Sequence, residues 1–432
     1  MATKWRSAAR AGRARGVGMG VNRDWETVMA AALERCQPGE AVRRALAGRD
    51  FSGGQLMLVA AGKAAFRMAE AALQVVRVDK GVVITKYGHA PGALPPLEVY
   101  EAGHPVPDEN GYRATERALE MVRGLTERDH VLLLISGGGS ALFESPLVKP
   151  EILEALTGAL LRSGADIRSI NAVRKRLSAV KGGKFALRCA PAHVTTIALS
   201  DVVGGGPDAI ASGPAAPDPT TCQHALAALK RYSVEIPEEA LPHLLTETPK
   251  ALPNADCVVA GGVAELCEAA ALRCRGLGYE TLILTDSLDC EAREAGRFLA
   301  AIARRCHESG RKLAFLAGGE TVVHVAGKGL GGRNQEIALA AAEGIRGLDD
   351  ALVFSFGSDG TDGPTDAAGG VVDGGSMDDL ERAGVSPEAA LRNNDAYHAL
   401  SAIGALIFTG PTGTNVNDLS ALLINGKEGK SC

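Results

Sequence analysis

The sequence has few aromatic residues and no large excess of charge of either sign. Phenylalanine, tryptophan and tyrosine together make up 4% of the 432 residues, and the formal net charge is -5 at pH 7. Surfaces that bind nucleic acids usually combine a basic patch with aromatic rings on which bases stack. The composition therefore argues against a nucleic acid as the main partner.

Long apolar runs and paired cysteines are missing as well. The apolar run HVLLLI at residues 130–135 is much shorter than the roughly 20 residues of a membrane-spanning helix, and it predicts a buried strand. None of the nine cysteines forms a C-x-x-C pair, which argues against a zinc site and against a disulfide framework. We therefore expect a cytoplasmic protein with free thiols and no membrane partner.

The chain is longer than one hydrophobic core usually allows, so we expect two domains. Residues 1–22 contain five lysine or arginine residues and no acidic residue, and they predict a disordered basic extension. Beyond it, short apolar runs alternate with amphipathic stretches, which indicates α/β domains with a mainly parallel sheet covered on both faces. Four prolines between residues 237 and 253 mark the expected boundary. A larger Rossmann-like domain would then span 23–245 and a second α/β domain 246–425, with the ligand site in the cleft between them.

Glycine-rich or lysine-bearing loops follow two predicted strands of the first domain. In HVLLLISGGGSALF the strand runs directly into Ser136, Gly137, Gly138, Gly139 and Ser140. Consecutive glycines let backbone N–H groups approach an anion closely, and the serines add donors, although a flexible turn is the alternative. In AAGKAA, Lys63 begins a helix, where an ammonium group is unfavourable unless an anion shares the space. A lysine that simply reaches solvent is the alternative for Lys63. Both loops predict an anion site at the carboxyl ends of the strands.

A basic stripe follows in SINAVRKRLSAVKGGK. Read as a helix that ends at Gly182, the segment separates an apolar stripe from a polar stripe of Asn171, Arg174, Lys175, Ser178 and Lys181. The polar stripe either collects anionic oxygens or is a solvated basic face. The next strand, HVTTIALSD, ends at Asp201, and Asp208 lies in the glycine loop beyond it. Asp201 is a candidate cation ligand or general base, and a turn aspartate is the alternative.

Carboxylates gather in the glycine-rich loops of the second domain. The run SDGTDGPTDAAGG at 358–370 follows the apolar strand LVFSFG and contains Asp359, Asp362 and Asp366, more carboxylates than a turn requires. Such loops hold hard cations or polyanionic ligands. Asp359 and Asp362 are therefore candidate metal ligands, whereas Asp366 is also suited to capping the next element.

Two further glycine pairs precede charged residues in this domain. Glu320 follows FLAGG, and GGRNQE places Arg333, Asn334 and Glu336 at the start of a helix. The guanidinium of Arg333 is well suited to bidentate contact with a phosphate or a carboxylate. Glu336 is either a ligand-binding residue or a negative charge that stabilises the helix dipole.

The sequence resembles the glycerate 2-kinases that carry a C-terminal MOFRL domain. The runs that carry the resemblance are, in their order along the chain, AAGKAA, LISGGGSAL, NAVRKRLSAVKGGK, LSDVVGG, GGET, GGRNQE and SDGTDGPTDAAG. The resemblance extends over nearly the whole chain beyond the basic extension. It implies ATP-dependent phosphorylation of D-glycerate to 2-phospho-D-glycerate with Mg2+. It also implies two α/β domains with the active site in the cleft, and catalytic roles for Lys63 and Arg333.

Residues and resemblance together give the expected site. Substrate or nucleotide binding is assigned to Ser136, Gly137, Gly138, Gly139, Ser140, Asn171, Arg174, Lys181, Glu320, Asn334 and Glu336. Catalysis is assigned to Lys63, Arg333 and Asp201, and metal binding to Asp201, Asp359 and Asp362. D-glycerate and ATP are the expected partners of a monomer or homodimer.

Some members of this family carry an older name, hydroxypyruvate reductase, which makes an NAD(P)H-dependent oxidoreductase the competing hypothesis. A hydride transferase of the Rossmann type should show GxGxxG after a strand and an acidic residue about 20 positions later. The sequence has no such fingerprint. A non-catalytic sugar-acid-binding protein stays open, although it would not need so many carboxylates in glycine loops. Phosphoryl transfer requires cations, amide-rich loops and carboxylates, and this chain has all three.

Overall fold

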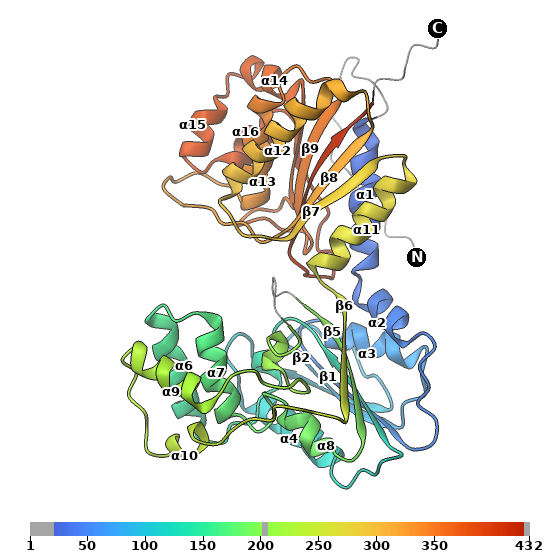
Figure 1. Cartoon of the computed structure of the whole chain (residues 1–432), viewed down its shortest axis with the longest axis vertical. Coiled ribbons are helices and arrows are strands. Elements are labelled where there is room, and N and C mark those ends of the chain that lie inside the picture. The colour runs from blue at the N-terminus through green and yellow to red at the C-terminus, as the bar shows by residue number, and fades with distance from the viewer. Residues whose placement is uncertain (1–20, 201–205, 427–432) are drawn as a thin grey trace. The chain divides into compact units, whose positions relative to one another are not determined.

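The structure is a computed structural model that describes residues 21–200 and 206–426. It divides into two compact units (Figure 1). Residues 38–260 form the N-terminal unit, and residues 261–426 together with 21–37 form the C-terminal unit. Asp201 and residues 1–20 of the predicted basic extension lie outside the described residues.

A six-stranded sheet organises the N-terminal unit. Its strands, in spatial order, are β3 (Leu97–Ala102), β2 (Lys80–Lys86), β1 (Leu56–Ala61), β4 (His130–Ile135), β5 (His193–Leu199) and β6 (Ala255–Gly261). The pairs β3–β2, β2–β1, β1–β4 and β4–β5 are parallel. Every residue of β1 is buried, as expected for a parallel strand that is covered on both faces.

Helices cover both faces of this sheet. They are α2 (Pro38–Leu46), α3 (Ala65–Leu73), α4 (Glu109–Met121), α5 (Gly139–Leu142), α6 (Pro150–Arg162), α7 (Ile167–Leu177), α8 (Lys184–Cys189), the 3-10 turn η1 (Ile210–Ser212), α9 (Cys222–Arg231) and α10 (Leu241–Leu244). Side chains of β1 alternate between two cores: Met57 and Val59 join the core that contains residues of α4 and α8, whereas Leu58 and Ala60 join the core of α2 and α3. Helices α6, α7, α9 and α10 share an apolar cluster of their own.

The sheet of the C-terminal unit also has six strands but is mixed. In spatial order they are β11 (Leu406–Ile407), β10 (Gly369–Asp373), β9 (Ala351–Gly357), β12 (Asp418–Ile424), β8 (Leu313–Gly319) and β7 (Glu280–Leu288). Strand β12 runs antiparallel to both β8 and β9, and β7 runs parallel to β8. The helices are α1 (Val21–Arg35), α11 (Val263–Gly276), α12 (Ala292–Cys306), the 3-10 turn η2 (His307–Ser309), α13 (Arg333–Gly344), α14 (Ser376–Arg382), α15 (Pro387–Arg392) and α16 (Ala396–Ala402).

The two α/β units and the mainly parallel first sheet confirm the predicted fold class, but the division of the chain differs from the predicted one. Strand β6 was expected in the second domain, yet it completes the first sheet beside β5. Helix α1 was expected in the first domain, yet its apolar side packs in the C-terminal unit, where the rings of Trp25 and Phe354 lie 6.0 Å apart. The division therefore falls after residue 260 rather than after residue 245.

The basic helix is shorter than predicted. Helix α7 ends at Leu177 rather than at Gly182, because Ser178 is extended, with φ -114° and ψ 145°. The backbone beyond the helix bonds to a neighbouring segment: the N–H of Ala179 donates to the carbonyl of Ser145 at 2.7 Å. Lys181 therefore does not continue the helical stripe of Asn171 and Arg174.

None of the helices within the described ranges combines the length and the apolar character that crossing a membrane requires.

Candidate active site

The two loops that the sequence predicts to bind an anion lie side by side, because β1 and β4 are neighbours. Ala61 pairs with Ile135 at the ends of these strands, so the chain leaves both strands at the same edge of the sheet. Chain order reverses here, with β2 on one side of β1 and β4 on the other, and ligands of open α/β sheets bind at such a point. The N–H of Lys63 donates to the carbonyl of Gly137 at 2.9 Å, and the N–H of Ala64 donates to Ser136 Oγ at 3.0 Å.

Glycine is required where these loops touch. Gly62 has φ +131°, and a Cβ on it would lie 2.2 Å from Ser136 Oγ. Gly138 has φ +85°, and a Cβ there would lie 2.9 Å from the ring of His104 and 3.4 Å from Cγ of Lys63. The Lys63 side chain therefore extends over the glycine loop. Its ammonium group is exposed, and no carboxylate among the described residues forms an ion pair with it.

A pocket of about 570 Å3 opens beside the glycine loop, entirely within the N-terminal unit. The predicted residues that line it are Ser136, Gly137, Gly138, Gly139, Ser140, Asn171 and Arg174. Lys175 and Asp208 line it too. We name it the glycine-loop pocket. Sequence reasoning thus selected this loop and this helix, but it did not select Arg168 of the same helix or His104, which also line the pocket.

The cations of α7 are fixed by hydrogen bonds behind this pocket. Arg174 Nη2 donates to the carbonyl of Ser140 at 2.9 Å. Lys175 is almost fully buried, and its Nζ lies 3.1 Å from both Asp208 and Asp218. Ser212 Oγ donates to Asn171 Oδ1 at 3.0 Å and lies 3.1 Å from Ser140 Oγ. The pocket wall is therefore held in place before any ligand binds, which lowers the cost of binding.

Lys181 takes a different position from the other predicted cations. It is fully buried, with its Nζ 3.1 Å from Glu144 Oε2 and 2.8 Å from the carbonyl of Phe143. Burial lowers the pKa of Lys181 to about 8. The structure thus places Lys181 in an internal ion pair near the glycine loop and outside the pocket lining.

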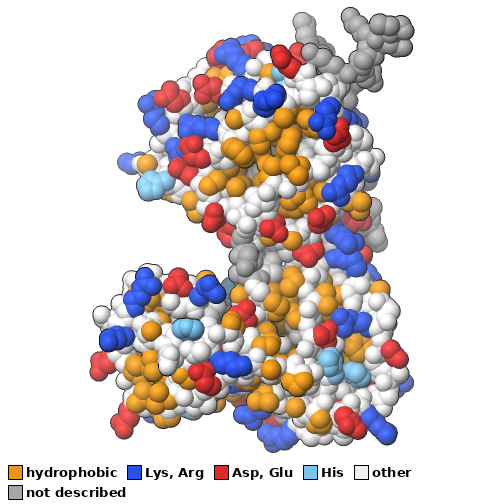
Figure 2. Space-filling model, in the orientation of Figure 1, with side chains coloured by type: hydrophobic (Ala, Val, Ile, Leu, Met, Phe, Trp, Pro, Cys, Tyr) orange, Lys and Arg blue, Asp and Glu red, His pale blue; other side chains and the backbone are white. Residues whose placement is uncertain are grey.

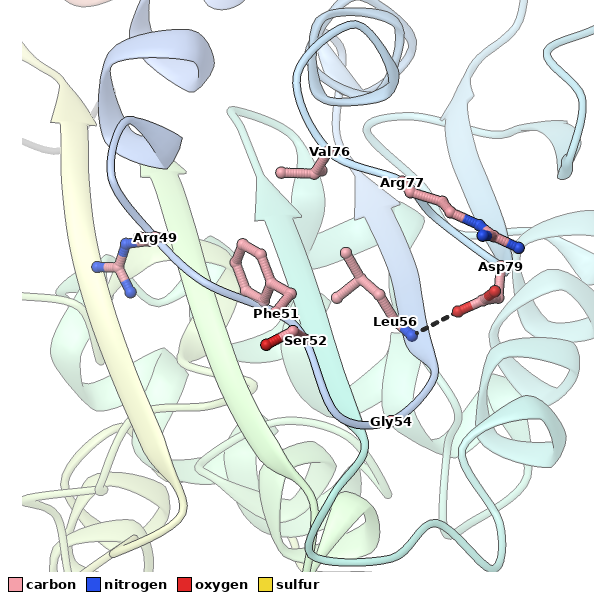
Figure 3. Close-up of a pocket in the computed structure, with 8 residues that line it drawn as sticks. All are labelled: Arg49, Phe51, Ser52, Gly54, Leu56, Val76, Arg77 and Asp79. Carbon is pink, nitrogen blue, oxygen red and sulfur yellow. Dashed lines mark hydrogen bonds between the residues drawn. The ribbon is translucent and has the colours of Figure 1, made fainter.

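A different hollow of about 480 Å3 lies at the opposite edge of the first sheet, near the start of β1 (Figure 3). Arg49 in its wall pairs with Asp256 at 3.1 Å, and Asp79 accepts the N–H of Leu56 at 2.8 Å. Those side chains tie the amino ends of the strands together. In sheets of this kind the carboxyl edge is where ligands bind, so we assign no role in the site to this hollow.

The C-terminal unit carries a second cluster at one edge of its sheet. Asp418 begins β12 and pairs with both Gly319 and Gly357, the last residues of β8 and β9. The guanidinium of Arg333, at the start of α13, donates to both carboxylate oxygens of Asp418 and, at 2.9 Å, to Glu320 Oε1. Burial raises the pKa of Asp418 to about 6 even though Arg333 acts in the opposite direction.

This cluster fixes the position of Arg333. Asn417, with φ +66°, donates from Nδ2 to Glu320 Oε2 at 3.1 Å and thereby holds the second carboxylate. Sequence reasoning found Arg333 and Glu320 but missed Asp418 and Asn417, because it searched the segments that follow strands. An antiparallel strand brings its first residue to the same edge, and the polar Asn417–Asp418 pair before the apolar run LSALLI was the available signal.

Most of the remaining predicted residues make internal contacts. Asn334 donates to Asp362 from its backbone at 3.1 Å and from its side chain at 3.2 Å. Glu336 is buried, which raises its pKa, and its Oε1 accepts the side-chain amide of Asn394 at 2.8 Å. These contacts anchor the first turn of α13, on which Arg333 stands.

The carboxylates of the 358–370 loop divide into different roles. Asp362 is buried and accepts the backbone N–H groups of Asn334 and Gln335, so it caps α13. Asp366 is exposed and accepts the hydroxyl of Tyr397 at 2.7 Å. Asp359 is half-buried, and its Oδ1 accepts both the N–H and the hydroxyl of Thr361. In the part of the chain that the structure describes, no three His, Cys, Asp or Glu side chains form a group that could hold a metal ion.

A stability measurement distinguishes a capping role from a metal-binding role for Asp362. Asp362→Asn places a side-chain NH2 against one of two backbone N–H donors, so we expect a loss of about 1–3 kcal/mol in the free energy of unfolding, measured in urea. The exposed Asp366→Asn is the control, with an expected loss of about 0.5 kcal/mol or less. Unchanged stability of Asp362→Asn together with a raised magnesium requirement would show that this carboxylate serves the metal instead.

Comparison with known proteins also assigns the two parts of the chain to different families, but the first family match has other bounds than the N-terminal unit of the structure, residues 38–260. A domain of unknown function, DUF4147, matches residues 24–245, and the MOFRL family matches residues 313–418. The D-glycerate 2-kinase of Thermotoga maritima is 51% identical over 401 residues, which cover 91% of this chain and 96% of that protein. The chain belongs to the glycerate 2-kinase family with a C-terminal MOFRL domain. The resemblance found in the sequence is therefore confirmed.

A solved structure and a relative with another name extend the comparison. The crystal structure of glycerate kinase from Thermotoga maritima superposes with a TM-score of 0.89 at 50% identity, covering 93% of this chain and 99% of that one. A protein of Agrobacterium vitis with the provisional name hydroxypyruvate reductase is 43% identical over 86% of this chain and 87% of its own length. Because the chain belongs to this family, it is a phosphotransferase. Some relatives nevertheless have a name that describes an oxidoreductase.

Proposed function

We propose that the protein transfers the γ-phosphoryl group of ATP to the 2-hydroxyl of D-glycerate and releases 2-phospho-D-glycerate. The observation that carries the proposal is the glycine-loop pocket at the β1–β4 edge, with Arg174 and Lys175 on its wall. Backbone N–H groups of a glycine loop and fixed cations are suited to phosphate oxygens. The names of the related kinases support D-glycerate as the acceptor.

The proposed roles follow from charge and exposure. The glycine-loop pocket would hold the phosphates of the nucleotide, and Lys63 would neutralise charge on the transferring group. Arg333 would bind the carboxylate of D-glycerate or the same phosphoryl group, since Asp418 and Glu320 fix its guanidinium. Phosphoryl transfer depends mainly on such positioning and charge neutralisation. That Lys63 and Arg333 serve one site stays a prediction.

Mg2+ is proposed as the accompanying cation, and it would neutralise charge on the nucleotide phosphates. Magnesium usually takes one or two protein carboxylates and fills its other positions with water and phosphate oxygens. Asp359 fits such a minimal role, because the described hydrogen bonds to its side chain involve only Oδ1. Asp362 fits poorly, since both its oxygens cap α13. The roles of Asp201 as ligand or base stay predictions.

A coupled assay tests the proposal directly. Purified protein with D-glycerate and MgATP is expected to release ADP, and NMR of the product is expected to show phosphate on the 2-hydroxyl. The control reaction supplies hydroxypyruvate and NADH without ATP. Oxidation of NADH in the control with no release of ADP in the kinase reaction would favour the oxidoreductase, and binding without either reaction would favour a sugar-acid-binding protein. The cytoplasm is the compartment we propose, in keeping with the free thiols of the described cysteines.

A further inference from the structure

A second hollow, of about 380 Å3, adjoins the glycine-loop pocket in the N-terminal unit. The two share Arg168, Pro219 and Thr220 in their walls, so they lie next to each other. Each has a volume within the range of about 300–1,000 Å3 that small-molecule sites occupy. The space beside the glycine loop is therefore extended, which suits a ligand with two chemically different ends.

The second hollow has a wall that differs from that of the first. One face of α9 presents His224, Ala227, Ala228 and Arg231, which follow each other at helical spacing. The two alanines leave an apolar gap between basic side chains, and Ala172 of α7 and Pro219 add to the apolar surface. Among the residues that the structure describes, no carboxylate lines this hollow. Figure 2 shows basic, acidic, histidine and hydrophobic side chains together on the surface of the α6–α9 region.

Its polar groups are oriented in advance. The N–H of Thr221 donates to Nδ1 of His224 at 3.1 Å, so the neutral ring carries its proton on Nε2, which remains a donor. Thr220 is anchored by Asp218, which accepts its N–H at 3.0 Å, and by Arg176 Nη2, which donates to its carbonyl at 2.9 Å. The rim between the two hollows is therefore rigid.

Resting on the proposed kinase function, we propose that the second hollow binds the purine base of the nucleotide while its phosphates occupy the glycine-loop pocket. Apolar groups and a guanidinium such as that of Arg231 are suited to the face of a base. A donor such as His224 Nε2 suits a ring nitrogen. Arg168 stands where the hollows meet and would lie next to the phosphate nearest the ribose.

Filling the gap between the alanines tests this assignment. Ala227 is exposed on the pocket side of α9, and Ala227→Phe should occupy the space of the base. We expect the Kd of the non-hydrolysable analogue AMP-PNP, measured by calorimetry without glycerate, to rise about tenfold, in keeping with the contribution of one stacked base. The Kd of inorganic tripolyphosphate, which has no base, should stay the same and so also reports that the variant is folded.

The matched control is Gln223→Phe, which introduces the same ring on an exposed position of α9 outside both hollows. It should leave both affinities unchanged. Equal loss of AMP-PNP and tripolyphosphate affinity in Ala227→Phe, or no loss of either, would overturn the assignment. So would wild-type protein that binds the two ligands equally well. Wild-type protein that binds AMP-PNP more tightly but does not phosphorylate D-glycerate would reject the proposed function and leave the base site standing.

Discussion

Arg333→Ala is expected to lower kcat/KM for D-glycerate about 100- to 1,000-fold, or about 2.7–4 kcal/mol of transition-state stabilisation, by analogy with the loss of one preorganised donor. The reason is that Arg333 is a fixed cation: Asp418 and Glu320 accept its hydrogen bonds from two different strand ends. A cation that is held in position before the reaction needs no reorganisation when charge develops. Steady-state kinetics at several D-glycerate and ATP concentrations measure the effect.

The same substitution should also affect the folded protein. Asp418 is buried, and removing Arg333 takes away the positive charge that favours its ionised form. We therefore expect the pKa of Asp418 to rise further and the protein to lose some stability, which unfolding in urea would report. Arg333→Lys keeps the charge but not the fork of donors that contacts both carboxylates. Compared with Arg333→Ala, it should therefore recover more of the lost stability than of the lost kcat/KM.

Arg346→Ala is the matched control. Arg346 lies in the same unit and also pairs with two carboxylates, at 2.7 Å from Asp378 and 2.8 Å from Glu381, but all three side chains are exposed. Surface ion pairs contribute about 0–1 kcal/mol to stability, so both rate and stability should stay near wild type. Near-normal kcat/KM in Arg333→Ala would show that Arg333 is a structural residue of the Asp418 cluster.

The neighbouring loops of the N-terminal unit were predictable because parallel strands all end at the same edge of a sheet. Each buried apolar run ends at one edge of the sheet, so the loops that contain Lys63 and Ser136 had to emerge at that edge. Their adjacency also required β1 and β4 to be neighbours, as the pairing of Ala61 with Ile135 shows. Spacing along the chain does not encode that pairing, and the prediction relied on the fold class.

The cluster of the C-terminal unit depends on features that local sequence patterns do not reveal. Asp418 reaches the strand edge from the opposite direction, because β12 is antiparallel to its neighbours. The carboxylates of the 358–370 loop looked alike in sequence, yet Asp362 caps a helix that starts 29 positions earlier, at Arg333. The described hydrogen bonds of the Asp359 carboxylate come instead from Thr361 in its own turn. Whether such a carboxylate caps a helix or binds a ligand depends on long-range contacts, which the composition of the loop does not reveal.

The structural units divide the chain differently from the predicted domains for a related reason. Prolines between 237 and 253 interrupt regular structure, but the chain then returns to the first sheet as β6. Helix α1 is amphipathic and suits any apolar surface by pattern alone. Its partner, the cluster that contains Leu266 and Phe354, comes more than 200 residues later. Sequence periodicity predicts that a helix has an apolar face to bury. The tertiary fold determines against which apolar surface that face packs.

Lys63→Ala is expected to lower kcat by a comparable factor, about 100- to 1,000-fold, while leaving the stability of the protein within about 0.5 kcal/mol of wild type. The Lys63 side chain extends over the glycine loop, its ammonium is exposed, and no ion pair of the described residues depends on it. Removing it therefore costs no internal contact of its charged group. Lys80→Ala is the control, because Lys80 is also exposed but begins β2, at the opposite end of the strand from the site.

The double variant Lys63→Ala/Arg333→Ala tests whether both cations act on the same reaction step. Residues that act together on one transition state lose activity non-additively, whereas independent effects add as free energies. We therefore expect the double variant to be only slightly slower than the slower single variant, with unfolding in urea confirming that it is folded. Fully additive losses in kcat/KM would mean that Lys63 and Arg333 support separate events, such as nucleotide binding and glycerate binding. Of the two proposed roles of Arg333, contact with the same phosphoryl group as Lys63 would then be wrong, although each cation would still contribute to turnover.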